Sequence, residues 1–92
     1  MKENRIIFAR VRYERQRLGA KQDEFGRLIG SKRANYAAKE LGRVPWNYSE
    51  MVILRDYINA NLPKDEDRLT LDVLFYATSV PNKERKLKHS SA

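Results

Sequence analysis

The sequence has no cysteine, no long apolar run, and only one histidine, His89, close to its C-terminal end. The absence of cysteine excludes disulfides and thiolate metal sites. With no Cys/His cluster, no nucleophile–base set and no phosphate-binding glycine loop, we expect no enzyme activity, no metal and no cofactor. The four apolar residues at 6–9 are too few for a signal peptide or a membrane span, so we expect a cytoplasmic protein without a membrane partner.

The whole chain has a net charge of +7, and its positive charge is concentrated in the first half. Residues 1–48 carry 12 Lys and Arg against five Asp and Glu, whereas residues 49–80 carry three against six. Residues 81–92 are basic again, with four against one. A basic half joined to an acidic, apolar-rich segment is typical of a nucleic-acid-binding face next to a core or partner face.

The pattern of apolar residues predicts an all-α fold with four to five short helices. These helices are expected at about 5–18, 22–29, 31–41, 49–61 and 68–79. The third and fourth are predicted to begin at the N-caps Ser31 and Ser49. Gly26 lies inside the second helix at a cost of about 1 kcal/mol relative to alanine, which predicts close approach of another helix there.

Two structures are compatible with residues 68–79. Leu69, Leu71 and Val73 alternate with polar residues as in a strand, whereas Leu71 and Leu74 also fit one face of a helix. We favour a fifth helix, because a lone strand has no partner within the chain and would need to pair with a second subunit.

The chain is predicted to form one domain over residues 1–80, followed by a disordered basic tail over residues 81–92. Within the domain, residues 22–42 predict two short helices joined by a tight glycine turn. The second of these helices opens with Ser31, Lys32 and Arg33. Exposed amides and positive charge at the start of a helix suit a phosphate-lined groove, so double-stranded DNA is the first partner to consider.

A longer set of residues resembles the lambdoid-repressor-like helix-turn-helix family, which includes the Cro and C-type phage repressors. The resemblance is carried by Arg10-Val11, Arg15, Leu18-Gly19, Gln22, Glu24-Phe25-Gly26, Gly30, Glu40 and Gly42. It covers about residues 7–42, extends more loosely to about residue 62, and is closest in character to small single-domain phage C repressors.

The resemblance implies a sequence-specific transcriptional regulator, most simply a phage-type repressor that binds operator DNA as a homodimer in a bacterial cell or phage-infected host. The alternative is an antitoxin that binds its own operator and uses the acidic, apolar segment 49–80 to hold a basic toxin. A further protein partner is therefore left open.

The resemblance also implies roles for individual residues. Base-reading positions are Lys32, Arg33, Ala34, Asn35 and Ala38, and phosphate-contacting positions are Lys21, Gln22, Ser31 and Arg43. Arg15 and Glu40 are expected to form an ion pair that joins the first helix to the end of the third. Alternatives remain open at three positions: Lys32 and Arg33 as non-specific phosphate contacts, and Asn35 as a base, phosphate or solvent contact. Lys39 and Glu14 stand where the family usually has apolar residues.

The last apolar segment, about residues 62–80, is predicted to mediate dimerisation. It supplies more apolar surface than the core of four short helices should need. The predicted interface residues are Leu69, Leu71, Leu74, Phe75 and Tyr76.

Overall fold

The computed structural model describes residues 8–76 of the chain. Its elements are α1 (Ala9–Arg17), α2 (Gln22–Leu28), α3 (Arg33–Glu40), α4 (Tyr48–Ala60) and a short π-helical turn, η1 (Asp72–Tyr76). Residues 8–76 contain no strand, which confirms the predicted all-α class. No helix in this part of the chain is long and apolar enough to cross a membrane.

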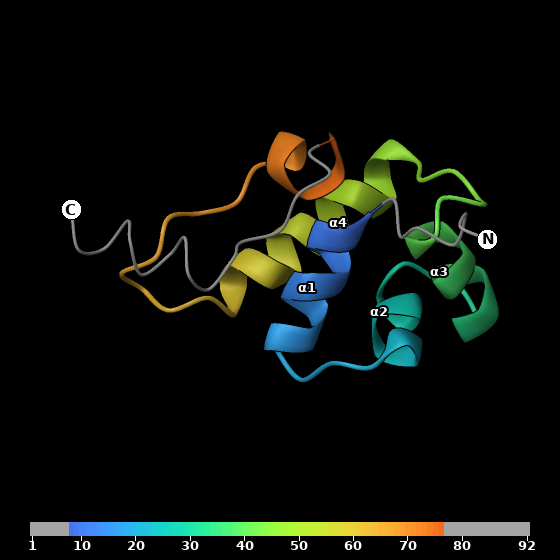
Figure 1. Ribbon diagram of the computed structural model, residues 1–92. Coiled ribbons are helices and arrows are strands. Elements are labelled where there is room, and N and C mark those ends of the chain that lie inside the picture. The colour runs from blue at the N-terminus through green and yellow to red at the C-terminus, as the bar shows by residue number, and fades with distance from the viewer. Residues whose placement is uncertain (1–7, 77–92) are drawn as a thin grey trace.

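The helices α2 and α3 form a closely packed pair, and α1 connects this pair to η1. Figure 1 shows α2 and α3 together at one end of the molecule and the orange turn η1 near the start of α1. Contacts join α2 to α3 and α4, and α1 to α3 and η1. The buried apolar core between these elements consists of Val11, Phe25, Tyr36, Met51, Leu54, Ile58, Leu62, Leu74 and Phe75.

An aromatic cluster around Trp46 closes this core. The Trp46 ring meets Phe8, Tyr36 and Phe75 in edge-to-face arrangements, with ring centroids 5.8, 5.7 and 5.1 Å away. Edge-to-face packing is the favoured arrangement of aromatic pairs and adds to the burial of their large apolar surfaces. The cluster joins the start of α1, α3, the α3–α4 loop and η1 in one contact set.

The position of η1 corrects part of the predicted dimer interface. Leu74 is 0% exposed and Phe75 is 4% exposed, so both belong to the chain's own core, whereas Tyr76 is 66% exposed. Leu69 and Leu71 are half-buried against that core. The cause is the small size of the domain. Four short helices do not enclose a core by themselves, so the apolar segment that was predicted to mediate dimerisation completes it. Residues 72–76 are helical rather than extended, and residues 77–79 lie outside the described part.

Two predicted N-caps are wrong. The N-caps of α3 and α4 are Lys32 and Asn47, in place of Ser31 and Ser49. The Asn47 side chain accepts a hydrogen bond from the Glu50 amide at 2.9 Å, and the Glu50 carboxylate accepts one from the Asn47 amide at 3.0 Å. This reciprocal capping box satisfies two backbone donors, whereas a cap at Ser49 would satisfy one.

Gly26 lies where α2 closely approaches the start of α3, as its position inside a helix predicted. A Cβ atom at Gly26 would lie 2.8 Å from the backbone oxygen of Ser31 and 3.4 Å from Cβ of Tyr36. The Ser31 amide donates to the Gly26 carbonyl at 2.8 Å, so the turn folds directly onto α2. A side chain here would push α3 away from α2, which explains why the helix tolerates glycine.

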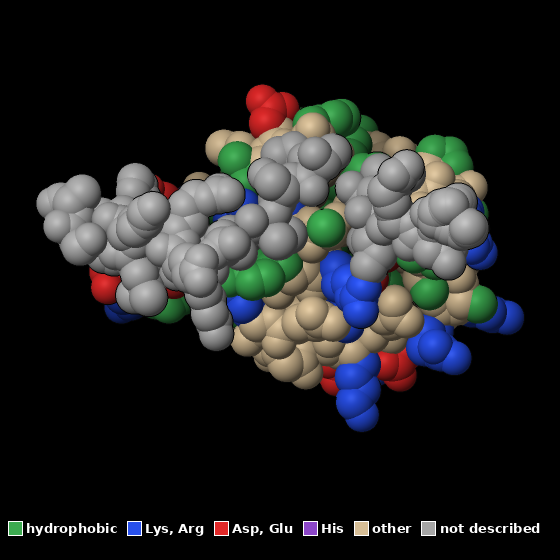
Figure 2. Space-filling model, viewed as in Figure 1, with side chains coloured by type: hydrophobic (Ala, Val, Ile, Leu, Met, Phe, Trp, Pro, Cys, Tyr) green, Lys and Arg blue, Asp and Glu red, His purple; other side chains and the backbone are tan. Residues whose placement is uncertain are grey.

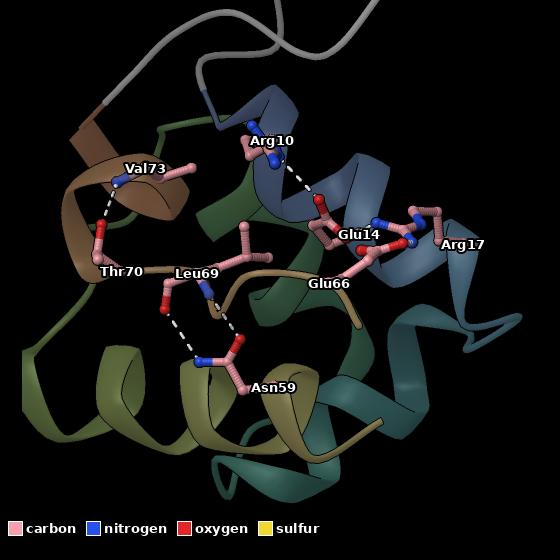
Figure 3. Close-up of polar contacts among 8 residues, drawn as sticks. All are labelled: Arg10, Glu14, Arg17, Asn59, Glu66, Leu69, Thr70 and Val73. Carbon is pink, nitrogen blue, oxygen red and sulfur yellow. Dashed lines mark hydrogen bonds and ion pairs between the residues drawn. The ribbon is translucent and has the colours of Figure 1, made fainter. Parts of the chain in front are cut away.

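Glu14 and Asn59 anchor the long connection between α4 and η1 (Figure 3). The fully buried Glu14 carboxylate pairs with Arg10 at 2.8 Å and with Arg17 at 3.0 Å, and Arg17 also binds Glu66 at 2.8 Å. The Asn59 amide makes two hydrogen bonds to the backbone of Leu69, at 2.8 and 2.9 Å. Two arginines therefore neutralise the buried charge of Glu14.

Replacing Leu74 by alanine tests the placement of η1. We expect Leu74→Ala to lower the free energy of unfolding by about 2–5 kcal/mol, because it leaves a cavity in the core. Tyr76→Ala, at the exposed neighbour, should cost about 1 kcal/mol or less. Urea denaturation measures both. If Leu74→Ala kept full stability but dissociated a dimer, the interface assignment would stand and the core assignment would fall.

Candidate nucleic-acid interface

The carboxylate of Glu40 is the centre of a buried polar network. Arg15 donates to it twice, from Nε to Oε2 at 2.8 Å and from Nη2 to Oε1 at 3.3 Å. The Tyr36 hydroxyl donates to Oε2 at 2.7 Å, and Nε2 of Gln22 donates to Oε1 at 3.2 Å. The predicted Arg15–Glu40 ion pair is thus present, and two further donors complete it.

The network sets the protonation behaviour of its members. Burial lowers the pKa of Arg15, but the hydrogen bond and charge of Glu40 outweigh burial and raise that pKa above its ordinary value. Burial, and then the negative charge of Glu40, raise the pKa of Tyr36 far above its ordinary value. Arg15 therefore stays charged and Tyr36 stays a hydrogen-bond donor at any physiological pH.

The Gln22 side chain has a structural partner in addition to its predicted phosphate contact. It was predicted to contact a DNA phosphate, and the structure places its side chain in the polar network, where one amide hydrogen is used by Glu40. The second amide hydrogen and the backbone N–H at the first turn of α2 have no acceptor in the described part of the chain. A phosphate contact remains compatible with this arrangement.

Of the predicted base-reading residues, Ala34 and Ala38 share the outer side of α3, whereas Lys32, Arg33 and Asn35 surround its start. Lys32, Arg33, Ala34 and Asn35 are exposed, and Ala38 is half-buried. With 3.6 residues per turn, Ala34 and Ala38 lie nearly opposite the buried Tyr36, and Arg33 and Asn35 lie on either side of them. The result is a helix face with a methyl-lined centre and polar flanks.

A basic depression lies beside the start of α3. It measures about 580 Å³ and is lined by Arg12, Arg15, Ala20, Lys21, Gln22, Asp23 and Arg33. It brings together the predicted phosphate residues Lys21 and Gln22 with the predicted base-reading residue Arg33. Figure 2 shows Lys and Arg side chains along the side of the molecule that carries α2 and α3.

Arg12 is a site residue that sequence reasoning missed. The first helix carries four arginines, Arg10, Arg12, Arg15 and Arg17, which the sequence alone does not distinguish. The structure separates them: Arg10 and Arg17 pair with Glu14, and Arg15 pairs with Glu40. Arg12 has no carboxylate partner among the described residues, and its side chain faces the depression. Its only signal in the sequence is that the neighbouring acids are too few for four arginines.

The other two predicted phosphate residues lie apart from this depression. Ser31 is half-buried in the turn before α3, and its hydroxyl accepts a hydrogen bond from Asn35 at 3.1 Å. Arg43 is exposed just beyond the C-terminal end of α3, where its amide donates to the Ala38 carbonyl at 2.8 Å. The predicted contacts are thus distributed along the whole length of α3.

Lys39 fixes the far end of α3 against α4. The Lys39 ammonium is buried, donates to Glu50 at 2.8 Å and to the carbonyl of Pro45 at 3.0 Å, and lies 5.8 Å from the centre of the Trp46 ring. The ion pair and the carbonyl contact compensate the cost of burying this charge. The pair limits the movement of α3 relative to α4.

No protein-family model, no curated protein and no solved structure matches this chain.

Neutralising Glu40 tests the polar network. We expect Glu40→Gln to lower the free energy of unfolding by about 3–5 kcal/mol, because it leaves the Arg15 charge buried without a counter-charge. Asp23→Asn is the matched control: its ion pair with Arg27 spans 3.8 Å with side chains 47% and 70% exposed. That control should cost about 1 kcal/mol or less. Equal effects of the two changes in thermal or urea denaturation would contradict a structural role for Glu40.

Proposed function

We propose that this protein is a sequence-specific regulator of transcription that binds double-stranded DNA through α3, in the manner of a phage-type repressor. The observation that carries the proposal is the exposed face of α3, where two alanines are flanked by Arg33 and Asn35 and a basic depression adjoins the helix start. The side chains available on this face are those that read base edges, next to those that hold phosphates.

The shape of this face suits a major groove. The groove of B-DNA is about 12 Å wide and admits one α-helix. The small side chains of Ala34 and Ala38 let the helix backbone approach the base edges, where their methyl groups can contact thymine. The network around Glu40 and the Lys39–Glu50 pair support α3 from behind, so the reading residues keep their positions when the helix enters a groove.

The cations around α3 supply the second part of binding. Arg12, Lys21 and Arg33 line the depression, and Lys32, which precedes Arg33 in the chain, is exposed. Lysine and arginine contacts to phosphates position a protein on the duplex and provide affinity that decreases with salt. Arg33 also stands at the first turn of α3, from which it can donate two hydrogen bonds to a guanine.

We further propose that the protein acts as a homodimer. Two copies of α3 would then enter successive major grooves about 34 Å apart. Because Leu74 and Phe75 are in the core, the part of the predicted interface that remains accessible is Tyr76 together with the half-buried Leu69 and Leu71.

Selection of bound sequences from a random duplex pool tests the function, and Arg33→Ala tests the reading residue. We expect one enriched, two-fold-symmetric site, and a loss of about 1–3 kcal/mol for Arg33→Ala on that site, with relaxed preference at one base pair. Arg27→Ala removes the same charge from an exposed α2 position outside the depression and should have a small effect. An equal loss on random DNA would make Arg33 a phosphate contact, and the absence of any enriched sequence would refute specific binding.

Arg12→Ala tests the phosphate role of the residue that the structure added. We expect weaker binding to all DNA sequences alike, and a slope of log affinity against log salt reduced by about one unit. The base preferences should not change. A salt slope equal to that of the unmodified protein would place Arg12 outside the interface.

A further inference from the structure

The side chains of Ser31 and Asn35 are joined at the exposed start of α3. Nδ2 of Asn35 donates a hydrogen bond to Oγ of Ser31 at 3.1 Å. The two residues are four apart, so the bond runs along one side of the first turn. Asn35 is exposed and Ser31 is half-buried in the turn that folds onto Gly26. The serine is thus a fixed support and the amide is the part that faces outward.

This bond decides which groups of the Asn35 amide remain available. A primary amide has two N–H donors and one oxygen acceptor. One hydrogen is used by Ser31, which leaves the second N–H and the carbonyl oxygen for another partner. No donor in the described part of the chain contacts that oxygen. Asn35 therefore has one donor and one acceptor left on the same amide, and the bond to Ser31 favours one orientation of that amide.

A donor next to an acceptor is the complement of one base. In the major groove adenine presents the N7 acceptor beside the N6 amino donor, whereas guanine presents two acceptors, N7 and O6. Thymine presents O4 and a methyl group, and cytosine presents an amino donor. The pinned amide matches both groups of adenine and only one group of each other base.

We propose that Asn35 reads an adenine through hydrogen bonds to N6 and N7, and that Ser31 is a positioning residue which holds the amide in the reading orientation. The inference rests on the proposed function and deepens it, because it names a base and assigns Ser31 a task other than capping. The hydroxyl hydrogen of Ser31 is left free by this bond and can still be donated to a phosphate, so the two roles are compatible.

The neighbours of Asn35 favour a base over a phosphate. Ala34 and Ala38 leave the centre of the face low, so a short side chain on its flank reaches base edges once the helix lies in the groove. A phosphate offers only acceptors, so it would use the free N–H of Asn35 and leave the amide oxygen without a partner. If Asn35 contacted only solvent, its hydrogen bond to Ser31 would have no role in recognition.

The experiment measures the affinity of the full chain for its selected site, with each base pair of one half-site replaced in turn. We expect Asn35→Ala to abolish a preference for adenine of about 5- to 150-fold at a single position, while preferences elsewhere persist. Ser31→Ala should keep adenine as the preferred base at that position and reduce the discrimination several-fold. Ser31→Thr, which retains a hydroxyl, should restore it. Circular dichroism checks that all three variants are folded.

A modified base separates the reading contact from other effects. Replacing that adenine by 7-deazaadenine removes the N7 acceptor and should weaken binding of the unmodified protein, but not of Asn35→Ala. If Asn35→Ala altered the preference at a G·C pair instead, the amide would be oriented the other way and the inference would be overturned. If no position responded, Asn35 would not read a base, although specific DNA binding would stand. If no sequence were selected at all, the proposed function itself would fail.

Discussion

The carboxylate of Glu40 is the constraint on which the arrangement of α1, α2 and α3 depends. Three residues from three helices, Arg15, Gln22 and Tyr36, donate to its two oxygens. A buried charge is tolerated only where such partners satisfy it, and removing one partner leaves the others with the cost of desolvation. The interaction is directional, unlike apolar packing, so it sets how α3 is oriented as well as how firmly it is held. This orientation leaves the outer face of α3 exposed.

The small size of the domain explains why the chain after α4 folds back over the core. Trp46 and Phe8 bring aromatic surface to one end of the helices, and Leu74 and Phe75 cover it. A domain of this length buries a smaller share of its surface than a large one, so it has few apolar residues to spare for other surfaces. The connection that precedes η1 is held by Glu14, Arg17 and Asn59, which gives this short turn a fixed place.

The use of charge divides the basic half of the chain into two sets. Arg15 and Lys39 are buried with carboxylate partners, and they fix the helices. Arg12, Lys21 and Arg33 line an open depression, and none of them has a carboxylate partner among residues 8–76. Net charge alone does not distinguish these sets, because it counts a paired and an unpaired arginine equally. The proposed DNA contacts therefore draw on the second set, and the rigidity of the surface that carries them draws on the first.

The sequence by itself determined the all-α class and the glycine turns, because helical periodicity and the tolerance of glycine for positive φ are local signals. The positive φ angles at Gly19, Gly30 and Gly42, 73°, 75° and 81°, agree with that origin. The Arg15–Glu40 pair, whose members are 25 residues apart, was expected only from the family resemblance. Only the tertiary structure decided which arginines remain available, that Leu74 and Phe75 lie in the core, and that Ser31 supports Asn35 instead of capping α3. Each of these depends on which side chains meet across helices or turns, and an apolar or charged residue looks the same in sequence whether its partner is its own chain or another molecule.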